Sequence, residues 1–244
     1  MISAIFHGFF LALFSCGITL NYRIGKLLNL SYGSFFTLGA YLSLIFPYNT
    51  SLALSALAGF SIGYFMYLVI SKISRDIIDS TLISLGFGIA IEEILRISFR
   101  ATHVLLTEVE LRYINIFGEE VSIFDLYTFL LSVAFFILLL TVFSGLSGLK
   151  LKFVEEDEEL AEIYGVNVEL LKMLTIACTS SVAALCGAIL SPMQAINPSM
   201  GWPILISAIV ISAISSVFGG VGFKRYAYVL LTSLIYSTIL EVIF

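Results

Sequence analysis

Two short polar segments, NLSYG at residues 29–33 and NPSMG at residues 197–201, interrupt apolar stretches and share Asn, Ser and Gly at the same spacing. An asparagine side chain can accept hydrogen bonds from the free N–H groups at a helix start, and a glycine lets two backbones approach closely. Pro198 and Pro203 prevent a continuous helix through the second segment. If the flanking stretches cross a membrane, irregular backbone there must be covered by protein or line a water-filled path. We therefore predict non-helical corners that face a cleft, with ordinary capping at the membrane surface as the alternative.

Charged side chains within the apolar stretches are few. Glu92 and Glu93 precede Arg96 by four and three residues, so they can form an ion pair along one helix face. Such a pair is either structural or part of a transport site. The two histidines, His7 and His103, and the three cysteines show no metal-ligand spacing. We therefore predict no bound metal and no catalytic constellation, and hence no enzyme.

The most polar part of the chain is residues 149–174, which hold seven of its seventeen acidic residues. The side chains of Phe153, Leu160, Ala161 and Tyr164 recur at helical spacing and predict an apolar stripe on one face of a helix of about three turns. Gly165 fits the end of that helix and a hinge, and Asn167 fits the N-cap of the next helix. An apolar face without a core of its own predicts a partner surface, whereas a solvated acidic loop is the alternative.

Composition shows which solvent surrounds these elements. The 244 residues have a mean hydropathy of +1.06, are 59% hydrophobic and only 12% charged, whereas soluble domains carry roughly 25% charged residues. Most of the chain must therefore contact lipid. A formal net charge of −5 gives no sign of nucleic-acid binding. We predict one all-α domain over residues 1–244, a polytopic transmembrane helical bundle. Its eight expected spans are 2–21, 27–46, 51–70, 80–99, 123–143, 173–192, 203–219 and 225–244.

Lys and Arg accumulate in cytoplasmic loops, and this bias predicts the orientation. Nine of them fall in alternate loops on one side, namely Arg23, Lys26, Lys72, Arg75, Lys150, Lys152, Lys172, Lys224 and Arg225. Three fall on the other side, namely Arg96, Arg100 and Arg112. Both termini are therefore expected outside. The two polar segments lie 168 residues and five spans apart, an odd number, which predicts an inverted three-span repeat unless the echo is coincidental. The long outer segment 100–122 could form a short strand or a surface helix, and it could equally be a docking surface.

Four blocks in order carry a resemblance to a known family, namely residues 17–42, 82–95, 155–173 and 197–222. The chain resembles the membrane permease subunits of branched-chain amino acid ABC importers, within the group that includes ribose-type permeases. The matching residues are Asn29, Gly33, Leu38, Gly39, Ala40, Tyr41, Asp157, Ala161, Gly165, Asn167, Pro198, Met200, Gly201, Ala208, Gly219, Gly220 and Gly222. The family commonly has Gln near Glu92 or Glu93, and a small-residue run after Gly222 where this chain has FKRYAYV.

The resemblance implies a substrate path and a coupling site. The path is assigned to Asn29, Ser31, Tyr32, Gly33, Gly39, Asn197, Pro198, Ser199, Gly201, Gly219, Gly220 and Gly222. Coupling to an ATPase is assigned to Phe153, Asp157, Leu160, Ala161, Tyr164, Gly165 and Asn167, within a cytoplasmic loop at 149–172.

The resemblance also implies partners and a substrate. The expected partners are a second, homologous permease subunit in a heterodimer, two ATP-binding cassette subunits and an external binding protein, all at the cell membrane. The chain has no Gly-x-x-x-x-Gly-Lys-Ser/Thr loop, so we expect it to bind no cofactor and the partner to use ATP. The expected substrate is Leu, Ile or Val, and other small solutes remain open. The alternative function is a stand-alone ion- or proton-coupled carrier that uses Glu92 or Glu93.

Overall fold

The computed structural model describes residues 2–74, 76–99, 104–106, 113–116 and 119–243. These residues form ten α-helices, one short 3-10 helix and a two-stranded hairpin. The first four helices are α1 (Ile2–Arg23), α2 (Tyr32–Ile45), α3 (Tyr48–Ile73) and α4 (Ile77–Phe99). They are followed by β1 (Tyr113–Ile116), β2 (Glu119–Ser122), α5 (Ile123–Ser144), α6 (Leu146–Glu156), α7 (Glu158–Ile163) and α8 (Val168–Leu190). The chain finishes with η1 (Ser191–Met193), α9 (Gly201–Val217) and α10 (Phe223–Ile243).

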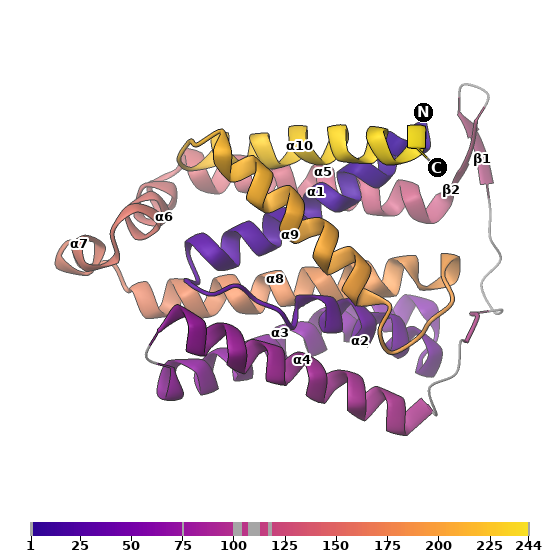
Figure 1. Ribbon diagram of the computed structural model, residues 1–244, viewed down its shortest axis with the longest axis horizontal. Coiled ribbons are helices and arrows are strands. Elements are labelled where there is room, and N and C mark those ends of the chain that lie inside the picture. The colour runs from indigo at the N-terminus through magenta and orange to yellow at the C-terminus, as the bar shows by residue number, and fades with distance from the viewer. Residues whose placement is uncertain (1, 75, 100–103, 107–112, 117–118, 244) are drawn as a thin grey trace.

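The long helices lie roughly side by side, and the short elements gather at the two ends of the bundle (Figure 1). We call the end that carries α6 and α7 the arm end, and the end that carries β1 and β2 the hairpin end. Helix α1 runs from the hairpin end to the arm end, whereas α8 runs the opposite way. Helix α1 packs against α10 and α9, and α8 packs against α3 and α2. Each interior helix, α1 or α8, therefore packs against one long helix and one short helix.

The fold is that of an all-α polytopic membrane protein. Five helices are long and apolar enough to cross a membrane, namely α1, α3, α5, α8 with η1, and α10. The shorter α2 and α9 are also apolar. A predicted span at 27–46 differs most from the structure, because residues 24–31 form no helix and α2 has only 14 residues. About 20 residues are needed to cross the hydrocarbon layer, so α2 alone cannot do so.

The core consists largely of aromatic and small side chains between the interior helices. The rings of Phe14 and Tyr32 meet edge to face with centroids 4.4 Å apart, and Phe36 packs on Phe14 at 5.9 Å. Tyr32, Phe14 and Phe36 are all fully buried. This cluster joins the first turns of α2 to the middle of α1, so it fixes where the polar segment before α2 lies.

The segment 100–122 contains a strand pair, one of the two structures expected for it. Strands β1 and β2 pair antiparallel, with Tyr113 opposite Ser122 and Ile116 opposite Glu119. Ser122 then caps α5, because its Oγ accepts the N–H of Phe124 at 3.3 Å. Residues 100–103, 107–112 and 117–118 lie outside the described residues, and so do Arg75, Arg100, His103 and Arg112 from the sequence analysis.

Candidate functional site

The two polar segments adopt the same turn. The side-chain Oδ1 of Asn29 accepts the N–H of Ser31 at 3.2 Å and its hydroxyl at 2.6 Å. In the second segment, Oδ1 of Asn197 accepts the N–H and the hydroxyl of Ser199, both at 3.1 Å. Each asparagine carbonyl also accepts an N–H three residues later, from Tyr32 and from Met200. Each asparagine thus accepts a backbone N–H in the turn that leads into α2 or α9. The prediction that the asparagines cap these helices is wrong, because the N-cap residues are Ser31 and Met200 and neither helix has a side-chain cap bond.

The segments also contact each other through their glycines. A Cβ atom on Gly201 would lie 1.9 Å from the carbonyl oxygen of Gly33, and a Cβ on Gly33 would lie 2.7 Å from that of Gly201. Only glycine allows two backbones to approach this closely. The N–H of Gly201 donates to Oγ1 of Thr37 at 3.2 Å, which adds a polar link between the helices. Positions 168 residues apart thus meet at one tight contact between the starts of α2 and α9.

Most of the remaining path residues are packed against neighbouring helices. A Cβ on Gly17 would lie 1.9 Å from the hydroxyl of Tyr32, so this tyrosine lies against α1. Gly39 lies against the backbone of Ala184 in α8. Asn29 and Ser31 are fully buried and Pro198 is buried, whereas Ser199 is exposed. The irregular backbone of the first segment is therefore covered by protein rather than by an open cleft.

The second segment borders a cavity. Asn197 lines a space of about 520 Å³ at the hairpin end, together with His7, Asp125, Gln194 and Pro203. This cavity lies between α1, α5 and the stretch that leads into α9. The two segments therefore share a local structure but differ in their access to open space.

The coupling loop is built from two helices, not from the single helix that was predicted. Helix α6 ends at Glu156 and α7 begins at Glu158, because Asp157 between them has extended backbone. Asp157 caps α7 by accepting the N–H of Leu160 at 3.1 Å. We call α6, Asp157, α7 and the turn through Tyr164 and Gly165 the arm. Since the break turns the chain, the predicted stripe does not follow one continuous helix face.

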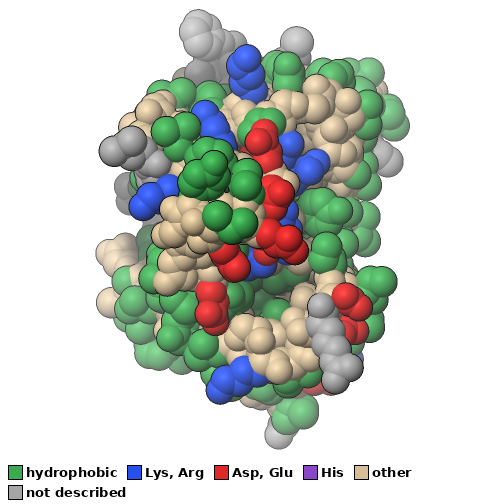
Figure 2. Space-filling view, turned by 90° about the vertical axis from the view of Figure 1, so that its left-hand side faces the viewer, with side chains coloured by type: hydrophobic (Ala, Val, Ile, Leu, Met, Phe, Trp, Pro, Cys, Tyr) green, Lys and Arg blue, Asp and Glu red, His purple; other side chains and the backbone are tan. Residues whose placement is uncertain are grey.

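The apolar residues of the arm point in different directions. Ala161 is fully buried, whereas Ile163 is 80% and Tyr164 is 69% exposed. The rings of Phe153 and Tyr164 stack with centroids 5.8 Å apart, and Phe153 and Leu160 are each about two fifths exposed. Figure 2 shows hydrophobic side chains at the arm end among many charged ones. The exposed surface is therefore Phe153, Leu160, Ile163 and Tyr164, and Ala161 belongs to the core.

Two further predictions for this loop are confirmed. Gly165 ends the arm with a positive φ of 76°, a conformation that glycine adopts readily. Asn167 caps α8, because its Oδ1 accepts the N–H of Leu170 at 3.0 Å. Only Val166 and Asn167 thus separate Gly165, at the end of the arm, from α8, a long and partly buried helix of the bundle.

Three glycines assigned to the path lie elsewhere, in the corner between α9 and α10 at the arm end. Gly219, Gly220 and Gly222 all have positive φ. The N–H of Gly222 donates to Oε2 of Glu155 at 3.2 Å, and the carbonyl of Gly220 accepts from Arg225. The structure therefore brings them to the arm and away from Gly33 and Gly201.

The arm is attached to this corner by a buried ion pair. Glu155 and Arg225 are only 6% and 8% exposed, and Nη1 of Arg225 contacts Oε1 of Glu155. A second acid of the arm, Glu158, contacts Lys172 of α8 and lies 3.8 Å from Nζ of Lys26. Burial lowers the pKa of Lys26, and the nearby Glu158 carboxylate opposes that shift. Charged side chains therefore join the arm to three separate elements of the bundle.

The acidic pair in α4 is divided between two partners. Arg96 forms an exposed ion pair with Glu93 at 3.0 Å, as the spacing predicted. Glu92 instead accepts a hydrogen bond from Oγ of Ser34 in α2 at 2.9 Å and is 7% exposed. The prediction that all three residues form one pair is wrong for Glu92, because its position on α4 faces α2.

Sequence reasoning missed several residues that build these sites. Arg225 and Lys26 were counted only as orientation signals, and Glu155 only as one acid in a run. Thr37 and Ser34 gave no signal, since hydroxyl residues are common in apolar helices. Their roles depend on contacts between elements far apart in the chain.

The fold defines a class of protein, a polytopic helical membrane protein with an arm at one end. The chain belongs to the family described as the branched-chain amino acid transport system / permease component, whose model matches residues 1–244. It is similar to the probable branched-chain amino acid transport permease protein LivH of Methanocaldococcus jannaschii. The two are 26% identical over 234 residues, which cover 89% of this chain and 72% of that relative. No solved structure matches the chain.

Proposed function

We propose that this chain is the membrane-spanning subunit of an ABC importer that moves branched-chain amino acids into the cytoplasm and takes energy from a separate ATPase. The match of the permease family over residues 1–244 is the observation that carries this proposal. The name of the archaeal relative, a probable branched-chain amino acid permease, supports the same substrate class.

The proposed docking surface for the ATPase is the exposed part of the arm, Phe153, Leu160, Ile163 and Tyr164. Apolar side chains that no core covers favour a partner. A push on the arm would reach α8 through Gly165 and Asn167, and the α9–α10 corner through Glu155 and Arg225. Such links can join nucleotide-driven closure to movement of the bundle, provided that the bundle has two arrangements.

We further propose eight membrane-crossing elements, with both termini outside and the arm in the cytoplasm. The excess of Lys and Arg in the loops at the arm end supports this orientation. We propose that α1, α2 and α3 repeat as α8, α9 and α10 in inverted topology. A shift of 168 residues carries the first set approximately onto the second, and the shared Asn–Ser turns and opposite helix directions support the repeat.

The proposed path includes residues 29–33 and 197–201. These segments are in tight contact through Gly33 and Gly201, so the proposal requires α2 and α9 to separate during transport. We propose that a second, homologous permease subunit completes the path at the cell membrane. An external binding protein delivers the substrate, and two ATP-binding subunits, not this chain, bind ATP.

Co-purification with the ATPase tests the proposal, together with uptake of labelled leucine by vesicles that contain the complete transporter. The variant Ile163→Glu changes an 80% exposed side chain, so the subunit should still fold. It should lose ATPase binding and reduce leucine uptake by about tenfold. The matched control is Leu105→Glu, which changes a 64% exposed side chain outside the arm and should keep the ATPase bound. Normal uptake and ATPase retention by Ile163→Glu would contradict the docking surface.

A stand-alone proton-coupled carrier is the second candidate, favoured by the buried carboxylate of Glu92 in an apolar helix. This function predicts leucine uptake by the permease alone under a proton gradient, abolished in Glu92→Gln. Uptake that instead requires ATP and the ATPase subunits would exclude the carrier and support the importer.

A further inference from the structure

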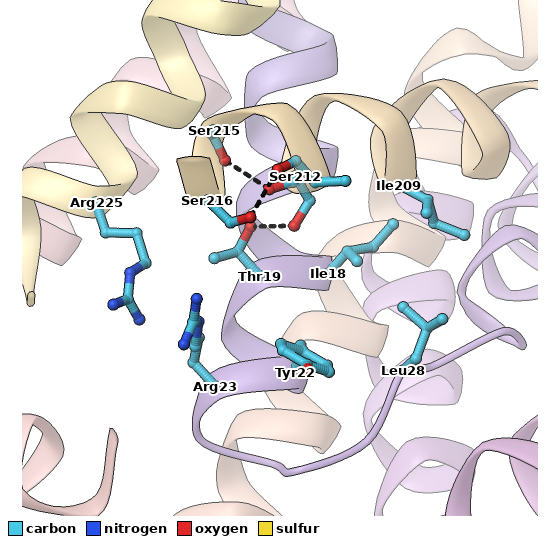
Figure 3. A pocket seen from close by; sticks show the side chains of 11 residues that line it. Ile18, Thr19, Tyr22, Arg23, Leu28, Ile209, Ser212, Ser215, Ser216 and Arg225 are labelled. Carbon is cyan, nitrogen blue, oxygen red and sulfur yellow. Dashed lines mark hydrogen bonds between the residues drawn. The ribbon is translucent and has the colours of Figure 1, made fainter. Parts of the chain in front are cut away.

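A cavity of about 370 Å³ lies between α1 and α9 near the start of α10 (Figure 3). Binding sites for small molecules generally occupy about 300–1,000 Å³, so this space can hold a solute the size of an amino acid. It lies next to the corner that the buried Glu155–Arg225 pair joins to the arm. A ligand here would therefore contact the elements that the arm can move.

Two guanidinium groups border this cavity, but they differ in how they are neutralised. Arg225 is held by the Glu155 carboxylate and donates to the carbonyl of Gly220. Arg23 contacts the ring of Tyr22 at 5.7 Å and has no carboxylate partner within the described part of the chain. Figure 3 shows the Arg23 side chain directed toward Thr19 and Arg225. Arg23 is therefore a half-buried cation with its fork of N–H donors available to an anion.

The cavity also offers groups that can bind a positive charge. The cavity lies at the C-terminal ends of α1 and α9, where helix dipoles place partial negative charge. Hydroxyl groups of Thr19 and Ser212 are 2.9 Å apart on its wall, and Ser216 adds a third. Carbonyl ends and hydroxyls can accept hydrogen bonds from an ammonium group. A ligand with only a negative charge would be repelled by both helix ends. A zwitterion can place its carboxylate at Arg23 and its ammonium group at the helix ends.

The rest of the wall is aliphatic. Ile18 of α1, Leu28 of the buried stretch before α2 and Ile209 of α9 line the side away from Arg225 (Figure 3). A branched aliphatic group buried there would be stabilised by removal of its surface from water. The three chemical features of the cavity are thus a cation, a set of acceptors and an apolar wall.

We propose that this cavity is a release-side site for a zwitterionic aliphatic α-amino acid. The ligand's carboxylate binds Arg23, its ammonium group binds the hydroxyls and helix ends near Thr19 and Ser212, and its side chain packs on Ile18, Leu28 and Ile209. This site rests on the proposed function, because it assumes that the transported solute is such an amino acid. It lies at the arm end, so it would hold the solute after the outer entrance has closed and before release.

The test is equilibrium binding of labelled leucine to the permease–ATPase complex, without binding protein, in nanodiscs of phosphatidylcholine. Arg23→Gln should weaken leucine binding by about tenfold or more. Isopentylamine, which lacks the carboxylate, should compete poorly with leucine in the wild type. 4-Methylpentanoate, which lacks the ammonium group, should also bind more weakly than leucine. Arg23→Lys keeps the charge without the planar fork and should give an intermediate loss, which distinguishes a binding contact from a folding defect.

Lys224→Gln is the matched control, because it removes a positive charge from an exposed residue at the same end that does not line the cavity. It should bind leucine as the wild type does. Unchanged binding in Arg23→Gln, in a complex that takes up leucine, would overturn this site and leave the importer intact. Absence of leucine uptake by the wild-type transporter would overturn the proposed function itself. An effect of Arg23→Gln that appears only when phosphatidylglycerol is added would assign the cavity to a lipid headgroup and overturn the proposal.

Discussion

The segments 29–33 and 197–201 have the same hydrogen-bonded turn and different surroundings. In both, an asparagine side chain accepts from the N–H and hydroxyl of the serine two residues later. The first segment contacts α1, α3 and α4, and Asn29 and Ser31 are fully buried. In the second, Ser199 is exposed and Asn197 borders a cavity. Local sequence thus determines the hydrogen bonds of the turn, whereas the neighbouring helices determine how deeply the turn is buried.

The same contrast holds for the helices that the segments begin. Helix α2 is largely buried between α8, α3 and α4, whereas α9 leaves Ile206, Val210 and Ile214 exposed. The two segments meet at Gly33 and Gly201, so this contact is common to both. Substitutions at matched positions can therefore separate the shared contact from the unequal burial.

The largest effect is expected from Gly201→Ala. The new Cβ would lie 1.9 Å from the carbonyl oxygen of Gly33, so α2 and α9 must move apart. We expect a loss of at least about 3 kcal/mol in the free energy of unfolding, measured by SDS titration in mixed micelles. Gly86→Ala is the control, because nothing lies within 4 Å of its Cβ position. That helical substitution should be neutral or stabilise by up to about 1 kcal/mol, and equal stabilities for the two variants would contradict the contact.

A smaller and unequal effect is expected from removing the two asparagine side chains that accept hydrogen bonds in the turns before α2 and α9. Asn29→Ala leaves the buried N–H of Ser31 without its acceptor and leaves the Ser31 hydroxyl with only the weak acceptor Sδ of Met66, which should cost about 2–3 kcal/mol. Asn197→Ala should cost only about 0.5–1 kcal/mol, because water can replace the lost acceptor at the exposed Ser199. The same SDS titration measures both losses. Equal losses would show that burial does not distinguish the segments.

The smallest effect is expected from Thr37→Val, which removes the hydroxyl that accepts the N–H of Gly201. The side chain keeps its shape, so we expect a loss of about 1 kcal/mol in the free energy of unfolding. Thr37→Ser retains the hydroxyl and should retain most of the stability. If Thr37→Val and Thr37→Ser were equally stable, the hydrogen bond between α2 and α9 would contribute nothing.

Patterns with a local cause could be predicted from the sequence. The non-helical asparagine turns before α2 and α9, the stop at Gly165 and the N-cap at Asn167 each depend on a side chain and backbone a few residues away. The ion pair of Glu93 with Arg96 follows from helical spacing alone. The single arm helix was wrong because Asp157 fits a helix interior and an N-cap alike, and packing of Ala161 into the core selects the cap.

The residues that join distant elements could not be found in this way. Whether Glu92 faces Arg96 or Ser34 depends on where α2 crosses α4. The glycines of the α9–α10 corner were grouped with the path because they match the family, yet their backbone bonds connect them to Glu155. Among seven acids in the arm region, only burial singles out Glu155 as the partner of Arg225.

Composition and local pattern are enough to specify the apolar helical character, the turns before α2 and α9, and the polar loop that carries the arm. These follow from composition and from interactions within a few residues, which are the same in any tertiary context. Tertiary structure decided that the two turns meet through Gly33 and Gly201, that Glu155 is buried against Arg225, and that Arg23 faces a cavity. Such contacts join residues far apart in the chain, so they depend on how whole helices pack.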